Sequence, residues 1–245
     1  MKGCGVGGLW LTCLLATPHA RTAAQTRMTA DEMLASNAVQ VRDRDGALTR
    51  SIGQIRTAID STLRLVSRLL PVTAVDITVI ADARRAIQGY GVGGFTPTAN
   101  TVEISVDPTF ADTARTLGER IAQTLAHELH HAIRERGPGY GRSLFESLIS
   151  EGLADHFAVE ALRIPPPPWT HALNGTASDA LLDSARTHFD DRPYDHAKWF
   201  FGSTRDIPQW TGYTLGYRLV SAYLAENPGQ NATTLVDAPA RVFRP

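Results

Sequence analysis

The first long pattern of apolar and polar positions in the chain is helical. Its apolar residues recur at intervals of three and four, as they do on one face of an α-helix, and a proline follows directly. These residues are Leu48, Ile52, Ile55, Ile59, Leu63, Val66 and Leu70, with Pro71 after them. The pattern predicts an amphipathic helix that buries one face.

Two shorter segments, residues 75–80 and 101–107, alternate between apolar and polar positions and predict strands. Between them lies a glycine-rich stretch, residues 89–95, with the sequence GYGVGGF. A phosphate-binding loop would end in Gly-Lys-Ser/Thr and lead into a helix, whereas this stretch leads into a strand. We therefore expect turns and a bulge there, within a small mixed sheet that precedes the next helix.

The next helical segment contains the sequence HELHH, from His127 to His131. At about 100° per residue, His131 lies about 40° from His127 on the helical wheel, and Glu128 lies about 100° away. His130 falls on the opposite flank. The neighbouring apolar positions gather on a different side, at Ile121, Leu125, Leu129, Ala132 and Ile133. One metal ion could therefore bind His127 and His131, with Glu128 beside it as a non-ligand.

Two carboxylates follow on a second helix. Glu151 lies 20 residues after His131, and Asp155 lies one turn further on the same face. Because that helix is apolar on nearly every side, an ionised carboxylate without a partner would be costly there. Zinc would satisfy Glu151, and an imidazole N–H would satisfy Asp155. The alternative is a buried acidic pair neutralised by an arginine, for which Arg134, Arg136 and Arg142 are the candidates.

These residues carry a resemblance. H-E-x-x-H followed twenty residues later by E-x-x-x-D resembles the thermolysin-type gluzincin metallopeptidases. The resemblance implies an α+β, zincin-like fold and one zinc ion bound by His127, His131 and Glu151. It also implies that Glu128 is the general base and that Asp155 orients His127. With residues 150–157, 199–202 and 210–217, the chain from about residue 50 resembles more narrowly the YjaZ-like bacterial family of predicted zinc-dependent proteases.

The predicted function is therefore a zinc-dependent peptidase that uses a metal-activated water, Glu128 as base, and a peptide or protein as substrate. One alternative is a non-catalytic protein in which zinc is a structural clamp and the surface binds a partner. Another is a metal hydrolase of a non-peptide amide or ester. Glu128 favours an enzyme, because a structural zinc site needs no base beside the metal.

Further candidates concern the oxyanion and the substrate. Tyr217, in a predicted helix over residues 210–226, is the first choice as oxyanion donor, and Tyr213 and Tyr140 are rivals. Each could instead be a packing aromatic. Substrate could add as an extended peptide to the strand ahead of the active helix, and the alternative is an ordinary interior strand. The strand residues concerned are Glu103, Ile104, Ser105 and Val106.

The composition and the N-terminus complete the prediction. The chain has 245 residues, 43% of them hydrophobic, and a net charge of −1, so no overall field attracts nucleic acid or an anionic membrane. Residues 1–24 predict a signal peptide, which implies export to the periplasm or medium, with the cytoplasm as alternative. Residues 25–47 predict a leader or peripheral helix. Residues 48–245 are predicted to form the metallopeptidase domain, without an integral membrane segment. Within this domain, the prolines at 165–168 predict a rigid connector, and the part from about residue 169 is predicted to be mostly helical.

Overall fold

A computed structural model describes residue 1 and residues 28–110 and 113–245. Both cysteines and the predicted signal peptide, apart from residue 1, lie outside these residues, so the signal peptide stays a prediction that N-terminal sequencing of the mature protein would test. None of the helices in the described ranges has the length and apolar character needed to cross a membrane.

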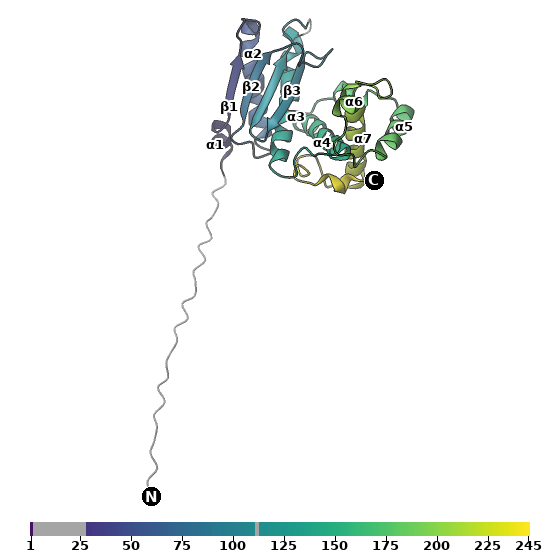
Figure 1. Ribbon diagram of the computed structural model, residues 1–245. Coiled ribbons are helices and arrows are strands. Elements are labelled where there is room, and N and C mark those ends of the chain that lie inside the picture. Colours follow the sequence, from purple (N-terminus) through teal and green to yellow (C-terminus); the bar gives the residue numbers. More distant parts are fainter. Residues whose placement is uncertain (2–27, 111–112) are drawn as a thin grey trace.

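The described chain is α+β, with one small sheet and a largely helical remainder, as the sequence predicts. Figure 1 shows the sheet and its helices as one half of the molecule and the C-terminal helices as the other. The elements are α1 (Ala30–Ala35), β1 (Ala38–Arg42), η1 (Thr49–Ser51), α2 (Ile52–Val66), β2 (Asp76–Ala81), β3 (Val92–Thr98), β4 (Thr101–Val106), α3 (Thr113–Glu135), α4 (Leu144–Leu162), η2 (Pro168–His171), α5 (Gly175–Arg186), α6 (His196–Phe201), α7 (Thr211–Glu226) and η3 (Ala240–Phe243).

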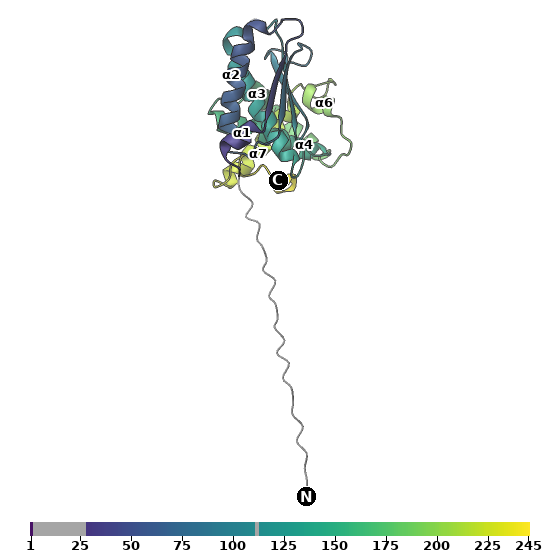
Figure 2. The ribbon, with the colours of Figure 1, turned by 90° about the vertical axis from the view of Figure 1, so that its left-hand side faces the viewer.

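The four strands lie in the order β1-β2-β4-β3, in which β1, β2 and β4 are parallel and β3 is antiparallel to β4. Because side chains alternate along a strand, Ile77, Val79, Val102 and Ile104 all point to one buried face. Figure 2 shows α2 and α3 against one side of the sheet. The sheet is therefore mixed and covered by helices, which is the arrangement that the sequence predicts.

The segment 25–47 contains more regular structure than predicted. The short helix α1 agrees with a peripheral helix, but Ala38–Arg42 form the strand β1, which pairs along β2. Val39 and Val41 are half-buried and alternate with exposed residues. This alternation is too short for the sequence pattern alone to predict a strand within a polar segment.

The prediction that an extended substrate peptide adds to the edge of the strand at Glu103–Val106 is wrong. These residues belong to β4, whose backbone pairs with β2 on one side and with β3 on the other, so it has no free edge for a peptide. The strand beyond β4, at this edge of the sheet, is β3, which begins inside the glycine-rich stretch. The predicted turn is also present, since Gly89 and Gly91 have φ of 79° and 77°.

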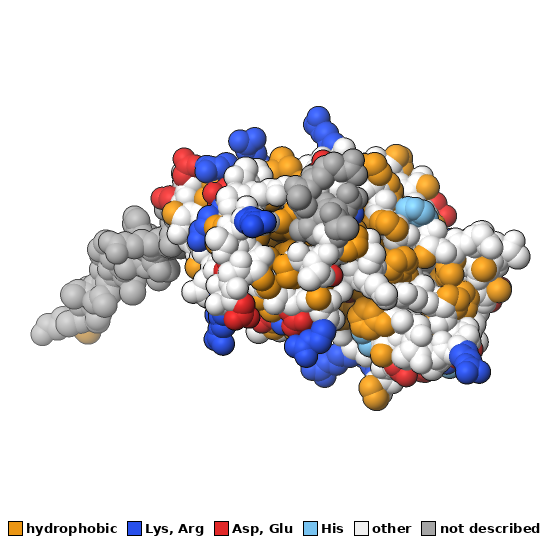
Figure 3. All heavy atoms as spheres, turned by 90° about the horizontal axis from the view of Figure 1, so that it is seen from above, with side chains coloured by type: hydrophobic (Ala, Val, Ile, Leu, Met, Phe, Trp, Pro, Cys, Tyr) orange, Lys and Arg blue, Asp and Glu red, His pale blue; other side chains and the backbone are white. Residues whose placement is uncertain are grey.

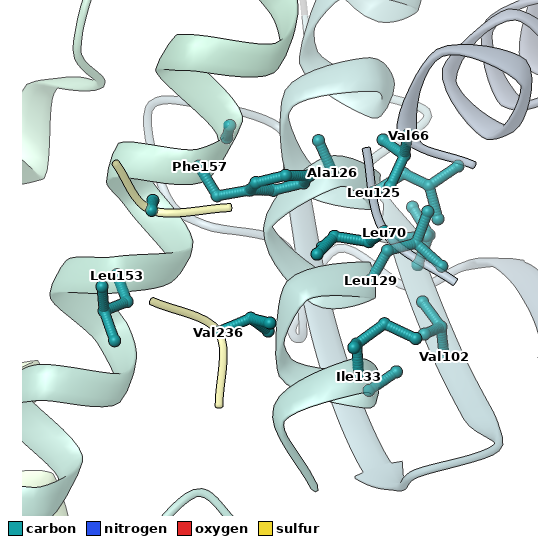
Figure 4. Close-up of a cluster of buried hydrophobic side chains, with 14 of the residues drawn as sticks. Val66, Leu70, Val102, Leu125, Ala126, Leu129, Ile133, Leu153, Phe157 and Val236 are labelled. Carbon is teal, nitrogen blue, oxygen red and sulfur yellow. The ribbon is translucent and has the colours of Figure 1, made fainter. Parts of the chain in front are cut away.

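Helix α3 lies between the sheet and α4. Figure 4 shows Leu125, Leu129 and Ile133 on the side of α3 where Val66, Leu70 and Val102 also lie, while Phe157 reaches across from α4. The stripe predicted from the helical wheel therefore faces α2 and the sheet. The packing fixes the rotation of α3 and with it the direction of the HELHH side chains.

The outer surface shows no dominant charge on the face seen from above. In Figure 3, Lys and Arg side chains stand mainly around its margins, mixed with Asp and Glu, and hydrophobic side chains spread between them. This mixture agrees with the net charge of −1.

Helices α4 and α7 touch backbone to backbone. A Cβ atom on Gly216 would lie 2.1 Å from the carbonyl oxygen of Leu148, and one on Gly152 would lie 2.3 Å from the carbonyl oxygen of Gly216. Only glycine permits this approach, because a side chain would meet main-chain atoms that cannot turn aside. The glycine pair thus holds α7 against α4.

We expect Gly216→Ala to lower the free energy of unfolding by about 1–3 kcal/mol or more, since it overpacks this contact. Gly53→Ala is the matched control: a Cβ atom on Gly53, in α2, would meet nothing within 4 Å apart from its chain neighbours and the backbone of its own helix, and alanine there should be neutral or stabilise by up to about 1 kcal/mol. Urea denaturation of both variants measures the difference. Equal stability of Gly216→Ala and the wild type would contradict the close contact.

Candidate metal centre

Helices α3 and α4 carry the predicted metal ligands, and α4 begins at a well-defined cap. The Ser143 hydroxyl accepts a hydrogen bond from the Glu146 backbone N–H, and the Glu146 carboxylate accepts one from the Ser143 N–H. This reciprocal pair sets the first turn of α4. Glu151 and Asp155 then follow on consecutive turns toward α3.

Side-chain atoms of His127, His131 and Glu151 converge within 4.8 Å of one another. The two Nε2 atoms lie 3.0 Å apart, and Glu151 Oε2 lies 3.1 Å from His127 Nε2 and 3.5 Å from His131 Nε2. A tetrahedral zinc ion with ligands at about 2.0–2.1 Å would separate its ligand atoms by about 3.3–3.4 Å. The two neutral imidazoles and the carboxylate therefore suit zinc in both spacing and chemistry.

Helix α4 and the connection between α3 and α4 supply further hydrogen bonds to these side chains. The His127 Nδ1–H donates to Asp155 Oδ1 at 2.9 Å, because an ionised carboxylate can only accept, and this leaves the lone pair of Nε2 available to a metal ion. The Tyr140 hydroxyl donates to Glu151 Oε1 at 2.7 Å. Tyr140 therefore holds one oxygen of Glu151 while the other oxygen faces His127, and Asp155 holds the His127 ring.

The alternative of an acidic pair neutralised by arginine is not what the structure shows. Arg134 donates to Ser150 Oγ and to the carbonyls of Val236 and Ala238. Arg136 donates to the backbone around Thr73 and Ala99. Arg142 is an exposed residue whose backbone N–H donates to Glu146. The carboxylates of Glu151 and Asp155 face imidazoles instead.

Glu128 stands beside the cluster and is only 7% exposed. The Thr96 hydroxyl of β3 donates to Glu128 Oε2 at 2.6 Å. A Cβ atom on Gly94 would lie 2.4 Å from Glu128 Oε1, so glycine lets β3 pass this close to the carboxylate. Burial raises the pKa of Glu128, although the charges of His127 and His131 oppose the change.

Two of the candidate ligands, His127 and Glu151, have strongly shifted pKa values. For His127, burial opposes protonation, but the charges and hydrogen bonds of Asp155 and Glu151 outweigh it and raise its pKa well above the usual range. For Glu151, burial favours the neutral acid, but the charge of His131 and hydrogen bonds from both histidines lower its pKa well below the usual range. The acid therefore stays ionised in this buried site.

His130 lies apart from the cluster, as the wheel predicts. It is fully buried, and its ring lies 5.3 Å from that of Phe157 on α4. Burial lowers the pKa of His130 well below its usual range. It is a neutral core residue.

A cavity of about 540 Å³ opens beside the cluster. His127 and Glu128 contribute to its lining, and β3 contributes Gly93, Gly94 and Phe95. Aromatic residues from the C-terminal half contribute to the lining, among them Trp169, Phe201, Trp210 and Tyr213. The cavity therefore lies between the sheet edge and the helices that follow α4.

The three candidate tyrosines lie in different places. Tyr213 lines the cavity, and Tyr140 is bound to Glu151. Tyr217 instead stacks on His156, with ring centroids 3.9 Å apart and planes 5° from parallel. The cavity lining among the described residues includes Tyr213 and not Tyr217.

The sequence from residue 55 to 244 matches the profile of the family described as predicted Zn-dependent protease (DUF2268). The chain belongs to this family. The match covers most of the chain and confirms the resemblance to predicted zinc-dependent proteases; the family's description agrees with a peptidase at that coarse level. No curated protein and no solved structure matches the chain significantly.

Sequence reasoning missed three residues of this family member's centre. Thr96 holds Glu128, Gly94 makes room for it, and Trp169 donates its indole N–H to Asp155 at 3.1 Å. One signal was present for Trp169, since a buried indole N–H needs an acceptor. Thr96 and Gly94 gave none, because nothing in the sequence placed residues 92–98 at the sheet edge.

We expect zinc binding to release protons and to weaken as pH falls, because His127 must lose its proton to become a ligand. The raised pKa of His127 stabilises the metal-free fold below the unfolded pKa of about 6.5, and this contribution disappears as pH rises through the folded pKa. The stabilisation by zinc should therefore increase with pH. Calorimetric titrations between about pH 6 and pH 8, in buffers of different ionisation enthalpy, measure both effects.

His131→Ala should lose tight zinc binding in the same titrations, because it removes one of three ligands. His188→Ala is the matched control, since His188 is half-buried and pairs with Asp191 away from the centre. Zinc affinity that is independent of pH, or unchanged in His131→Ala, would refute the assignment.

Proposed function

We propose that the protein is a zinc-dependent peptidase of the gluzincin type, with one zinc ion held by His127, His131 and Glu151. The observation that carries the proposal is the set of three candidate ligand atoms, close to tetrahedral spacing, next to the buried carboxylate of Glu128, which lines a cavity. A zincin-like fold is part of the proposal. It is supported by a mixed sheet with an antiparallel edge strand, followed by the two ligand helices.

When bound, zinc supplies a Lewis acid and an acidified water. Glu128 accepts the proton of the attacking water and passes it to the leaving amine. Its raised pKa suits both roles, because a base whose pKa is closer to neutral also gives the proton back more readily. Thr96 holds the carboxylate in place without blocking its second oxygen.

Tyr213 is our choice for the donor to the developing oxyanion, in place of Tyr217. It lines the cavity with His127 and Glu128. Burial and the charges of Glu151 and Asp155 raise the pKa of Tyr213 well above its usual range, so its hydroxyl keeps its proton and can donate it in a hydrogen bond. Tyr140 is already committed to Glu151.

The edge strand β3 is our choice for the substrate-binding strand, in place of β4. It contributes Gly93, Gly94 and Phe95 to the cavity, and beyond Val92, whose carbonyl accepts the Ile87 N–H, no strand of the described residues pairs with its outer edge. An extended peptide that pairs with this edge would pass over Glu128. Phe95 and Phe201 are each 55% exposed at the cavity, which favours substrates with large apolar side chains near the cleaved bond.

A structural zinc clamp is the weaker candidate, because Glu128 and the cavity have no role in it. A hydrolase of non-peptide amides or esters uses the same centre, and only substrate tests separate it from a peptidase. If the predicted signal peptide is removed on export, the substrates are peptides or proteins outside the cytoplasm.

Glu128→Gln should lower peptide hydrolysis by about 10²–10⁴-fold and keep stoichiometric zinc, since it removes the base and none of the ligands. Digestion of a mixed peptide library with product sequencing measures activity and side-chain preference together, and metal analysis measures zinc. If the wild-type protein binds zinc and cleaves non-peptide amides or esters but no peptides, the result contradicts the peptidase assignment and favours the non-peptide hydrolase.

Tyr213→Phe should lower kcat by about 10²-fold or more with little change in KM, as expected for a donor used in the transition state. Tyr217→Phe is the matched control four residues along the same helix and should keep its kcat. Steady-state kinetics on one cleaved peptide compares them. Loss of activity in Tyr217→Phe alone would restore the assignment made from sequence.

A further inference from the structure

The proline run after α4 delivers a tryptophan to the metal centre. Helix α4 ends at Leu162, Arg163 takes a left-handed conformation with φ of 54°, and Pro165 to Pro168 lead into η2. Each proline fixes its own φ, so the segment is stiff. Trp169 follows directly and is only 7% exposed.

The Trp169 indole N–H points at the Asp155 carboxylate and lies 3.1 Å from both oxygens. Asp155 is 1% exposed and also accepts the bond from His127 Nδ1 on Oδ1. The indole thus bridges the two oxygens while the imidazole binds one of them. This pair of contacts fixes the rotation of the carboxylate about its own axis.

Trp169 is itself anchored, so it cannot follow a rotation of Asp155. Its carbonyl accepts a hydrogen bond from the Thr214 hydroxyl of α7 at 2.8 Å. Its ring packs edge-on against Tyr90, with centroids 5.1 Å apart. The next residue, Thr170, binds back to the Pro167 carbonyl through its hydroxyl at 2.7 Å. The indole therefore acts as a fixed donor.

We propose that Trp169 is a positioning residue that acts through Asp155 on His127 and so aims His127 Nε2 at the metal. The inference deepens the proposed function and rests on its metal centre. Among the described residues, His131 Nδ1 has no hydrogen-bond partner, so the centre depends for its imidazole orientation on the chain from Trp169 through Asp155 to His127. The alternative is that Trp169 only fills space.

Trp169→Phe tests this, because it keeps an aromatic ring and removes the N–H. Affinity for Zn²⁺, measured by competition with a chromogenic chelator, should fall by about 10–100-fold. The visible spectrum of the Co²⁺-loaded protein should also change. Trp199→Phe is the matched control: Trp199 is equally buried, at 3%, and does not line the cavity. It should lose stability without losing metal affinity.

A double-mutant cycle with Asp155→Asn tests whether the effect of Trp169 on metal affinity passes through Asp155. If Trp169 acts through Asp155, Trp169→Phe should cost much less metal affinity in the Asp155→Asn background than in the wild type. Additive losses would show that the two residues act separately. If Trp169→Phe does not fold, Thr214→Val removes the anchor of the Trp169 carbonyl and should weaken metal binding in the same direction.

Wild-type metal affinity and an unchanged Co²⁺ spectrum in Trp169→Phe would overturn the proposal and leave a packing role. These readouts do not depend on catalysis. A wild-type protein that binds zinc but cleaves no substrate would overturn the proposed peptidase while the metal titrations still decide the role of Trp169. A wild-type protein that binds no metal would overturn both.

Discussion

Glu151 and Asp155 are buried on α4, a helix whose other sides are apolar and packed against neighbours on both flanks. An ionised carboxylate in such a place destabilises the fold by several kcal/mol unless donors surround it. The donors come from His127 on α3, Tyr140 on the α3–α4 connection and Trp169 beyond the proline run. Two acidic side chains therefore draw together three segments that are distant in the sequence.

The remaining packing maintains this convergence. Leu125, Leu129 and Ile133 fix the rotation of α3 against the sheet, and Gly152 with Gly216 brings α7 within backbone contact of α4. Helix α7 in turn places Tyr213 at the cavity and ties Thr214 to the Trp169 carbonyl. The same glycine contact therefore supports both the cavity wall and the donor of Asp155.

The sequence predicts the parts of this centre that follow from periodicity. The wheel places His127, His131 and Glu128 together and sets His130 aside, and the apolar surroundings of Glu151 and Asp155 require partners. It cannot identify those partners in space. Tyr213 and Tyr217 lie one turn apart on one helix, and only the tilt of α7 decides which reaches the cavity. Strand order is a tertiary property as well, so alternation along the chain reveals neither that β3 lies at an edge of the sheet nor that β1 forms the opposite edge.

Trp169 is engaged on two sides, since its ring lines the cavity and its N–H serves Asp155. A smaller residue there would enlarge the binding space and loosen the metal ligand in one step. Selectivity among substrates can change without disturbing the metal centre through Phe95 and Phe201, two exposed lining residues that take no part in the hydrogen bonds described for the centre. In this architecture, some residues of the cavity lining are constrained by chemistry and others are open to adaptation.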